Sequence, residues 1–115
     1  VHWAQRGGAN PIEVINHFAG RVALIHLKDY RVGQIDLSDL KDMSNFMNKF
    51  TGNIEFAELG KGNLDIKGIL EAGLTSGVQY FLIEQDDTYG RDPFDCLKES
   101  GDYLKQLGYS ELFDR

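Results

Sequence analysis

The stretch Leu24-Ile25-His26-Leu27-Lys28-Asp29 (LIHLKD) closes an apolar run over residues 21–27 and ends it in ionisable side chains. A mostly apolar run of this length predicts a buried strand. A second run, VQYFLI at residues 78–83, is followed in the same way by Glu84 and by a pair of aspartates. We therefore predict two buried strands that each present polar groups at their carboxyl ends.

Helix signals lie before, between and after these strands. Asn10-Pro11, Asp65 and Asp92-Pro93 are typical helix starts, and a glycine closes each of the patterns that follow. In the last helix, up to Gly108, we expect an inward face made of Phe94, Leu97, Leu104 and Leu107. An amphipathic helix is also predicted at residues 36–50, inside a long connection, from the spacing of Leu37, Leu40, Met43, Phe46, Met47 and Phe50.

Apolar strands separated by helices indicate an α/β fold with parallel strands, covered by helices on both faces. In such folds the ligand site lies outside the carboxyl ends of the strands. We therefore expect the polar residues that follow both predicted strands to lie at the ligand site.

Length and composition limit the classes of protein. The 115 residues suffice for one domain. The net charge of -6, without a basic cluster, disfavours nucleic acid as a partner. The single Cys96 excludes an internal disulfide, and the sequence has no 18-residue apolar span, so we predict a cytoplasmic chain without membrane contact. The start at Val1-His2-Trp3 without Met reads as the end of a strand, so we expect a fragment of a longer protein.

His26 and Glu84 form the sharpest candidate pair, because an imidazole and a carboxylate on neighbouring strands suit a divalent cation. The alternative is a satisfied histidine beside an ordinary surface glutamate. Lys28 and Asp29 could bind a polar substrate or pair with each other. The GKG turn at residues 60–62 has a phosphate-cradling composition, but a turn that leads into a helix requires glycines as well.

Several motifs occur in a characteristic order: HW at residues 2–3, GANP at 8–11, IHLKD at 25–29, ELGKGNLD at 58–65, FLIEQD at 81–86 and DPF at 92–94. This order resembles the C-terminal half of the sugar phosphate isomerase/epimerase family. That family belongs to the xylose isomerase-like TIM barrels of the AP endonuclease family 2 superfamily, which also include inosose dehydratases. The resemblance implies that residues 1–115 are a single partial domain, the C-terminal portion of a (β/α)8 barrel.

The resemblance also implies site residues. His26 and Glu84 match metal ligands that follow the seventh and eighth strands of the family, and Glu84 matches a catalytic carboxylate. The expected ion is Mn²⁺, Mg²⁺, Co²⁺ or Zn²⁺, and the family's other two ligands are not in this chain, so the site is expected to be incomplete. Substrate contacts are expected from Trp3, Lys28, Asp29 and Arg31.

The implied activity of the complete protein is isomerisation or epimerisation of a sugar or sugar phosphate. The proton would move through an enediolate, and the fragment alone would be inactive. An inosose-type dehydratase and a non-catalytic α/β domain that docks through residues 37–50 are the alternatives. Because an open sheet leaves unpaired edges, we also expect a homo-oligomer.

Overall fold

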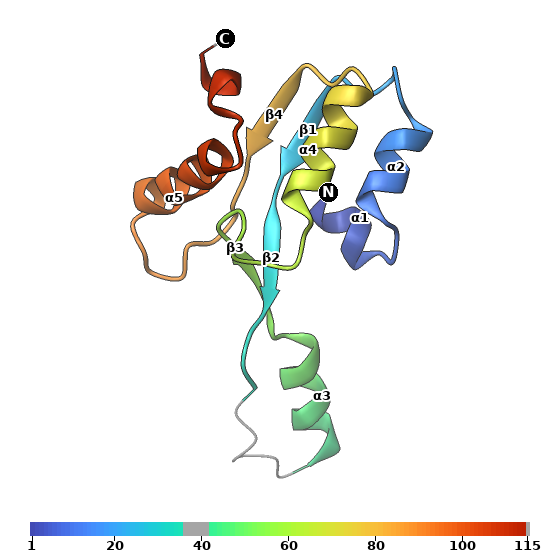
Figure 1. Ribbon diagram of the computed structural model, residues 1–115. Coiled ribbons are helices and arrows are strands. Elements are labelled where there is room, and N and C mark those ends of the chain that lie inside the picture. Colours follow the sequence, from blue (N-terminus) through green and yellow to red (C-terminus); the bar gives the residue numbers. More distant parts are fainter. Residues whose placement is uncertain (36–41, 115) are drawn as a thin grey trace.

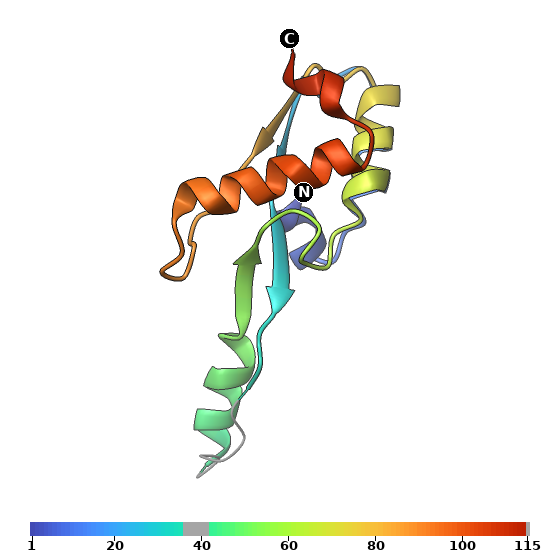
Figure 2. The same cartoon turned by 60° about the vertical axis from the view of Figure 1, so that its left-hand side comes forward.

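The computed structural model describes residues 1–35 and 42–114. The elements are α1 (His2–Arg6), α2 (Pro11–His17), β1 (Leu24–Leu27), β2 (Asp29–Val32), α3 (Met43–Thr51), β3 (Ile54–Ala57), α4 (Ile66–Thr75), β4 (Tyr80–Ile83), α5 (Pro93–Gln106) and the 3-10 helix η2 (Ser110–Phe113). Strands β2 and β3 with helix α3 form an arm that extends away from the remaining elements, the body (Figures 1 and 2). The molecule is accordingly elongated, measuring 53 × 33 × 18 Å.

Both predicted strands exist, and they pair in parallel as β1 and β4, with Leu24 opposite Tyr80 and Leu27 opposite Ile83. The α/β prediction with parallel strands is thereby confirmed. Alternate side chains point to opposite faces of a strand. In β1, Ile25 and Leu27 are buried, whereas Leu24 and His26 are exposed. Within residues 1–35 and 42–114, only one face of this sheet is therefore covered, not two as predicted.

Helix α4 packs on the covered face. A Cβ atom added at Gly73 would lie 2.8 Å from the Phe81 ring and 3.1 Å from Cδ1 of Ile25, so only glycine permits this close approach. Helix α2 packs against α4 in turn. The core that results consists of Ile15, Ile25, Leu27, Leu59, Leu64, Ile66, Ile69, Leu70, Ala72, Val78 and Leu104.

The predicted helix starts are confirmed by their capping contacts. The side chain of Asn10 accepts the backbone N–H of Ile12 at 3.0 Å, and that of Asp65 accepts the N–H of Gly68 at 2.9 Å. Asp92 does the same for Phe94 at 2.7 Å. These caps satisfy N–H groups that the first helical turn leaves without a partner.

The face predicted for α5 is partly wrong. Leu104 is buried, but Phe94 is 81% exposed and Leu97 is 49% exposed. Cys96 and Ser100 are buried instead. They precede Leu104 at four-residue spacing, and their small size allows α5 to approach the loop before α4, where Ser100 Oγ accepts the N–H of Leu59 at 3.0 Å.

One further prediction requires correction. Residues 1–3 do not end a strand, because His2–Arg6 is helix α1 and Gln5 donates its N–H to the carbonyl of Val1. The long connection after β1 also contains two strands besides the predicted helix: β2 pairs antiparallel with β3, with Asp29 opposite Ala57 and Val32 opposite Ile54. The described residues thus give two two-stranded sheets and no closed barrel.

Helix α3 overlaps the amphipathic helix predicted at residues 36–50 and ends one residue beyond it, at Thr51. Leu37 and Leu40 lie outside the described residues. Met43 of this helix is 73% exposed and Phe50 is 55% exposed. In the described part of the chain, no helix is long and apolar enough to cross a membrane.

Candidate active site

The fold brings His26 and Glu84 together, as the sequence predicted. His26 is in β1, and Glu84 follows β4 directly, where its N–H continues the parallel ladder by donating to the carbonyl of Leu27 at 3.0 Å. The two side chains lie on the exposed side of the sheet, with Nδ1 of His26 2.6 Å from Oε2 of Glu84. Their side chains are 51% and 38% exposed, so both groups are accessible to a ligand.

Lys28 lies beside this pair and is almost fully buried, at 4% exposure. Its Nζ is 2.5 Å from Oδ2 of Asp86 and 3.5 Å from Oε1 of Glu84. It also lies 4.9 Å from the centre of the Phe56 ring and 5.5 Å from that of Trp3. The carboxylates and the ring faces compensate the ammonium for its lost hydration.

Asp86 is a site residue that the sequence reading missed. The sequence did not single it out among the polar residues after β4, but Asp86 forms the shorter of the two ion pairs of Lys28. Because the register of β1 and β4 sets this pairing across 58 positions of the chain, only its place after a predicted strand could have indicated it.

Asp29 has a structural position. It is fully buried, and its two carboxylate oxygens accept the backbone N–H groups of Tyr30, Gly60, Gly62 and Leu64 at 2.8–3.2 Å. A Cβ atom at Gly62 would lie 2.2 Å from Asp29 Oδ1, which explains that glycine. In the GKG turn, whose composition is compatible with phosphate binding, the backbone N–H groups thus bind the carboxylate of Asp29 instead. This burial favours a structural role for Asp29 over the predicted contact with substrate.

Arg31 and Trp3, the remaining predicted substrate contacts, differ in their surroundings. Arg31 is in the arm, where its Nε lies 2.9 Å from Oε2 of Glu55 and its guanidinium also reaches Glu58 at 3.8 Å. It belongs to a different group of charges from His26 and Glu84. Trp3 is 62% exposed and borders Lys28, so it remains at the edge of the site.

A second group of charges fastens the loop after β4 to α5. Nη1 of Arg91 lies 2.7 Å from Oε1 of the buried Glu58, and Arg91 and Lys61 both pair closely with Glu99. Arg91 and then Lys61 lower the pKa of Glu99 to about 2. Burial alone would raise the pKa of Glu58, but hydrogen bonds from its own backbone and from Cys96, with the charge of Arg91, lower it. Both carboxylates are therefore ionised near neutral pH.

The donor set for a metal is partial. His26 and Glu84 offer one nitrogen and carboxylate oxygens on the same side of the sheet. Within residues 1–35 and 42–114 no group of three or more His, Cys, Asp or Glu side chains is arranged to hold an ion. The two residues fit part of a divalent-metal shell, and further ligands would have to complete it.

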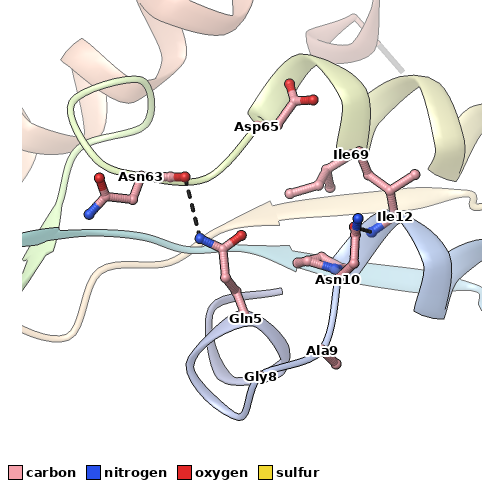
Figure 3. A pocket seen from close by; sticks show the side chains of 9 residues that line it. Gln5, Gly8, Ala9, Asn10, Ile12, Asn63, Asp65 and Ile69 are labelled. Carbon is pink, nitrogen blue, oxygen red and sulfur yellow. Dashed lines mark hydrogen bonds between the residues drawn. The ribbon is translucent and has the colours of Figure 1, made fainter.

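A separate cavity of about 430 Å³ lies between the α1–α2 connection and the start of α4 (Figure 3). Gln5 crosses its edge and donates to the carbonyl of Asn63 at 3.3 Å, while Asn10 and Asp65 cap helices. The polar groups of this cavity therefore serve the fold, and it contains none of the candidate catalytic residues.

Comparison with known proteins gives a partial relationship. An inosose dehydratase from Clostridium beijerinckii is 28% identical over 102 residues, which are 86% of this chain and 33% of that protein. An inosose dehydratase from Lacticaseibacillus casei is 30% identical over 99 residues, 84% of this chain and 33% of that protein. The chain is similar to one third of an inosose dehydratase.

The similarity covers only part of these relatives. The chain spans about a third of the length of these curated relatives. No family model matches the sequence, and no solved structure matches it. The names of these relatives describe enzymes that dehydrate an inosose.

Proposed function

We propose that this chain supplies one wall of the active site of a dehydratase acting on a polyhydroxylated cyclic ketone such as an inosose. The observation that carries the proposal is the contact between His26 and Glu84 at the carboxyl end of the parallel strands, with Lys28 beneath them. The names of the relatives supply the substrate class.

In this proposal Glu84 is the group that moves the proton. Loss of water from a hydroxyketone begins when the C–H bond next to the carbonyl breaks and its proton goes to a base. The electron pair then forms a carbon–carbon double bond, and the neighbouring hydroxyl leaves as water after it gains a proton. The carboxylate of Glu84 is 38% exposed and can reach a ligand laid over the sheet.

Lys28 has a supporting role. Its ammonium lies 3.5 Å from Oε1 of Glu84 and is held there by Asp86 and by the rings of Phe56 and Trp3. A fixed positive charge at this distance stabilises the carboxylate anion and attracts oxygen atoms of a bound ketone. Because it is already buried, the charge needs little rearrangement when a ligand binds.

A divalent cation held by His26, Glu84 and ligands from outside the described residues would polarise the ketone carbonyl and so acidify the adjacent C–H bond. The two residues of this chain would then orient the carbonyl over the strand ends. With only these two donors, the chain alone is expected to bind the ion weakly and to turn over little or no substrate.

Isomerisation or epimerisation of a sugar or sugar phosphate is the second candidate. It shares the first step, removal of a proton beside a carbonyl, and differs only in where the proton returns. The accessible pair His26–Glu84 serves either reaction, whereas the names of the relatives favour dehydration.

The decisive experiment is an NMR titration of the chain with Mn²⁺ and then with an inosose. Paramagnetic broadening is expected first at His26 and Glu84, and the substitutions His26→Ala and Glu84→Gln should remove it. His17→Ala, which changes an exposed histidine of α2, is the matched control and should leave the broadening in place. Broadening centred elsewhere, or unchanged by His26→Ala, would refute the site. Product analysis of the longer protein then distinguishes loss of water from isomerisation.

A further inference from the structure

His2 is a buried imidazole that the proposed chemistry does not use. It has no exposed surface, and neither of its ring nitrogens has a hydrogen-bond partner within the described residues. A neutral imidazole carries one N–H donor and one acceptor nitrogen. Leaving both unpaired in the interior costs free energy, so an orphaned histidine of this kind needs a physical reason.

Aromatic rings form the walls around His2. The ring centres of Trp3, Tyr30 and Phe56 lie 4.6, 5.0 and 5.4 Å from that of the imidazole. Two of these walls are also the rings that face the ammonium of Lys28, namely Trp3 and Phe56. His2 therefore lies against the same aromatic side chains that border Lys28 in the candidate active site.

The three walls are not equally fixed. The hydroxyl of Tyr30 accepts a hydrogen bond from Gln5 at 3.2 Å, and the backbone N–H of Phe56 donates to the hydroxyl of Tyr89 at 2.8 Å. Trp3 is 62% exposed, and among the described residues its indole is held by ring contacts and by the cations of Arg6 and Lys28. Trp3 is thus the wall that can turn with the least loss of contacts.

The charge state of His2 suits a neutral ligand. Burial, followed by the positive charges of Arg6 and Lys28, lowers the pKa of His2. The ring is therefore uncharged near neutral pH and can accept a hydrogen bond from a hydroxyl group or donate one to it.

We propose that Trp3 is a movable lid over His2, and that the opened imidazole binds a hydroxyl group of a polyol ligand that also contacts Lys28 and Glu84. The inference rests on the proposed function, because it requires a hydroxylated ligand at the ends of β1 and β4. It adds to that function a specificity-determining residue, His2, whose buried nitrogens become satisfied only in the ligand-bound state.

The lid is tested without any ligand. Exchange of the imidazole C2 hydrogen with deuterium, followed by mass spectrometry, reports solvent access to His2. We expect slow but measurable exchange in the chain, faster exchange after Trp3→Ala, and no change at His17. If His2 exchanges only as fast as the whole chain unfolds, and Trp3→Ala leaves that rate unchanged, the lid is refuted.

Ligand contact is tested by NMR titration with an inosose as the probe. His2→Phe fills the same space without nitrogens and is expected to keep the fold while weakening binding about tenfold, the effect of one lost hydrogen bond. His2→Gln restores a donor and an acceptor and should recover part of the affinity. A role in packing alone predicts the reverse order, with Phe tolerated better than Gln.

The outcomes separate the two proposals. If the probe binds, and His26→Ala weakens binding while His2→Phe does not, the inference is wrong and the proposed function stands. If the probe does not bind to the unmodified chain, the ligand part of both proposals fails, and the exchange measurement still decides whether Trp3 opens.

Discussion

The two sheets of the molecule have the same number of strands but differ in how they are supported. The parallel pair β1–β4 is covered on one face by α4 and the core, whereas the antiparallel pair β2–β3 belongs to the arm and carries α3 at its end (Figures 1 and 2). The candidate active site lies at the junction of these regions. Lys28 is the one residue between β1 and β2, and it is enclosed by residues from both regions. The body thus places His26 and Glu84, and the arm contributes Phe56 to the wall beside them.

The largest effect is expected at the junction. Asp29→Ala removes a buried carboxylate that accepts four backbone N–H groups, and these lose their partner. The free energy of unfolding should fall by about 4 kcal/mol. Asp42→Ala removes a cap in the arm, where the side chain of Asp42 accepts the N–H of Asn45 at 2.7 Å, and should cost only about 1 kcal/mol. Urea unfolding measures both, and equal losses would contradict a structural role for Asp29.

The next effect compares the body with the tip of the arm. Leu70 is fully buried in α4, so Leu70→Ala should lower the free energy of unfolding by about 3 kcal/mol through lost burial and a residual cavity. Met43 of α3 is 73% exposed, and Met43→Ala should change the free energy of unfolding by less than about 0.5 kcal/mol. A large loss from Met43→Ala would show that the arm is covered in solution, for example by the predicted second copy of the chain.

Features that depend on nearby residues were predictable from the sequence. The caps at Asn10, Asp65 and Asp92 each join residues two or three positions apart, and the apolar runs defined β1 and β4. The contact between His26 and Glu84 followed from the rule that parallel strands end at one edge. This prediction did not depend on the conformation of any loop.

Features that depend on distant pairing were not predictable. Strands β2 and β3 have four residues each and mix apolar with charged side chains, and they form a sheet by pairing with each other. The burial of His2 depends on the rings of Tyr30 in β2 and Phe56 in β3. Because the pairing of these strands was not predicted, the sequence alone placed His2 at the end of a strand and gave it no role in the site. Lys28 and Asp86 are 58 positions apart, and only the register of the parallel pair brings them together.

A smaller effect is expected from the cation at the junction. Lys28→Met removes a buried ammonium and leaves Asp86 and Glu84 with unbalanced negative charge. Because Asp86 is 43% exposed and keeps part of its hydration, we expect a loss of about 1–2 kcal/mol, below that of a fully buried pair. Lys98→Met, which breaks the exposed pair between Lys98 and Asp102 on α5, is the control and should leave the urea midpoint nearly unchanged. A midpoint equally insensitive to both changes would contradict the enclosed position of Lys28.

The smallest effect concerns the pH dependence of stability. Burial lowers the pKa of His2 in the folded chain, so below about pH 6.5 the unfolded chain binds more protons than the folded one. The free energy of unfolding should therefore fall as the pH drops through that value, and it should not depend on this group above pH 7.5. His2→Phe removes this contribution and should flatten the curve between about pH 7 and pH 5, whereas His17→Gln, at an exposed position of α2, should retain the slope. Urea unfolding at several pH values measures the difference. An unchanged slope in His2→Phe would mean that the imidazole is solvated in solution, and Trp3 would then have no buried group to cover.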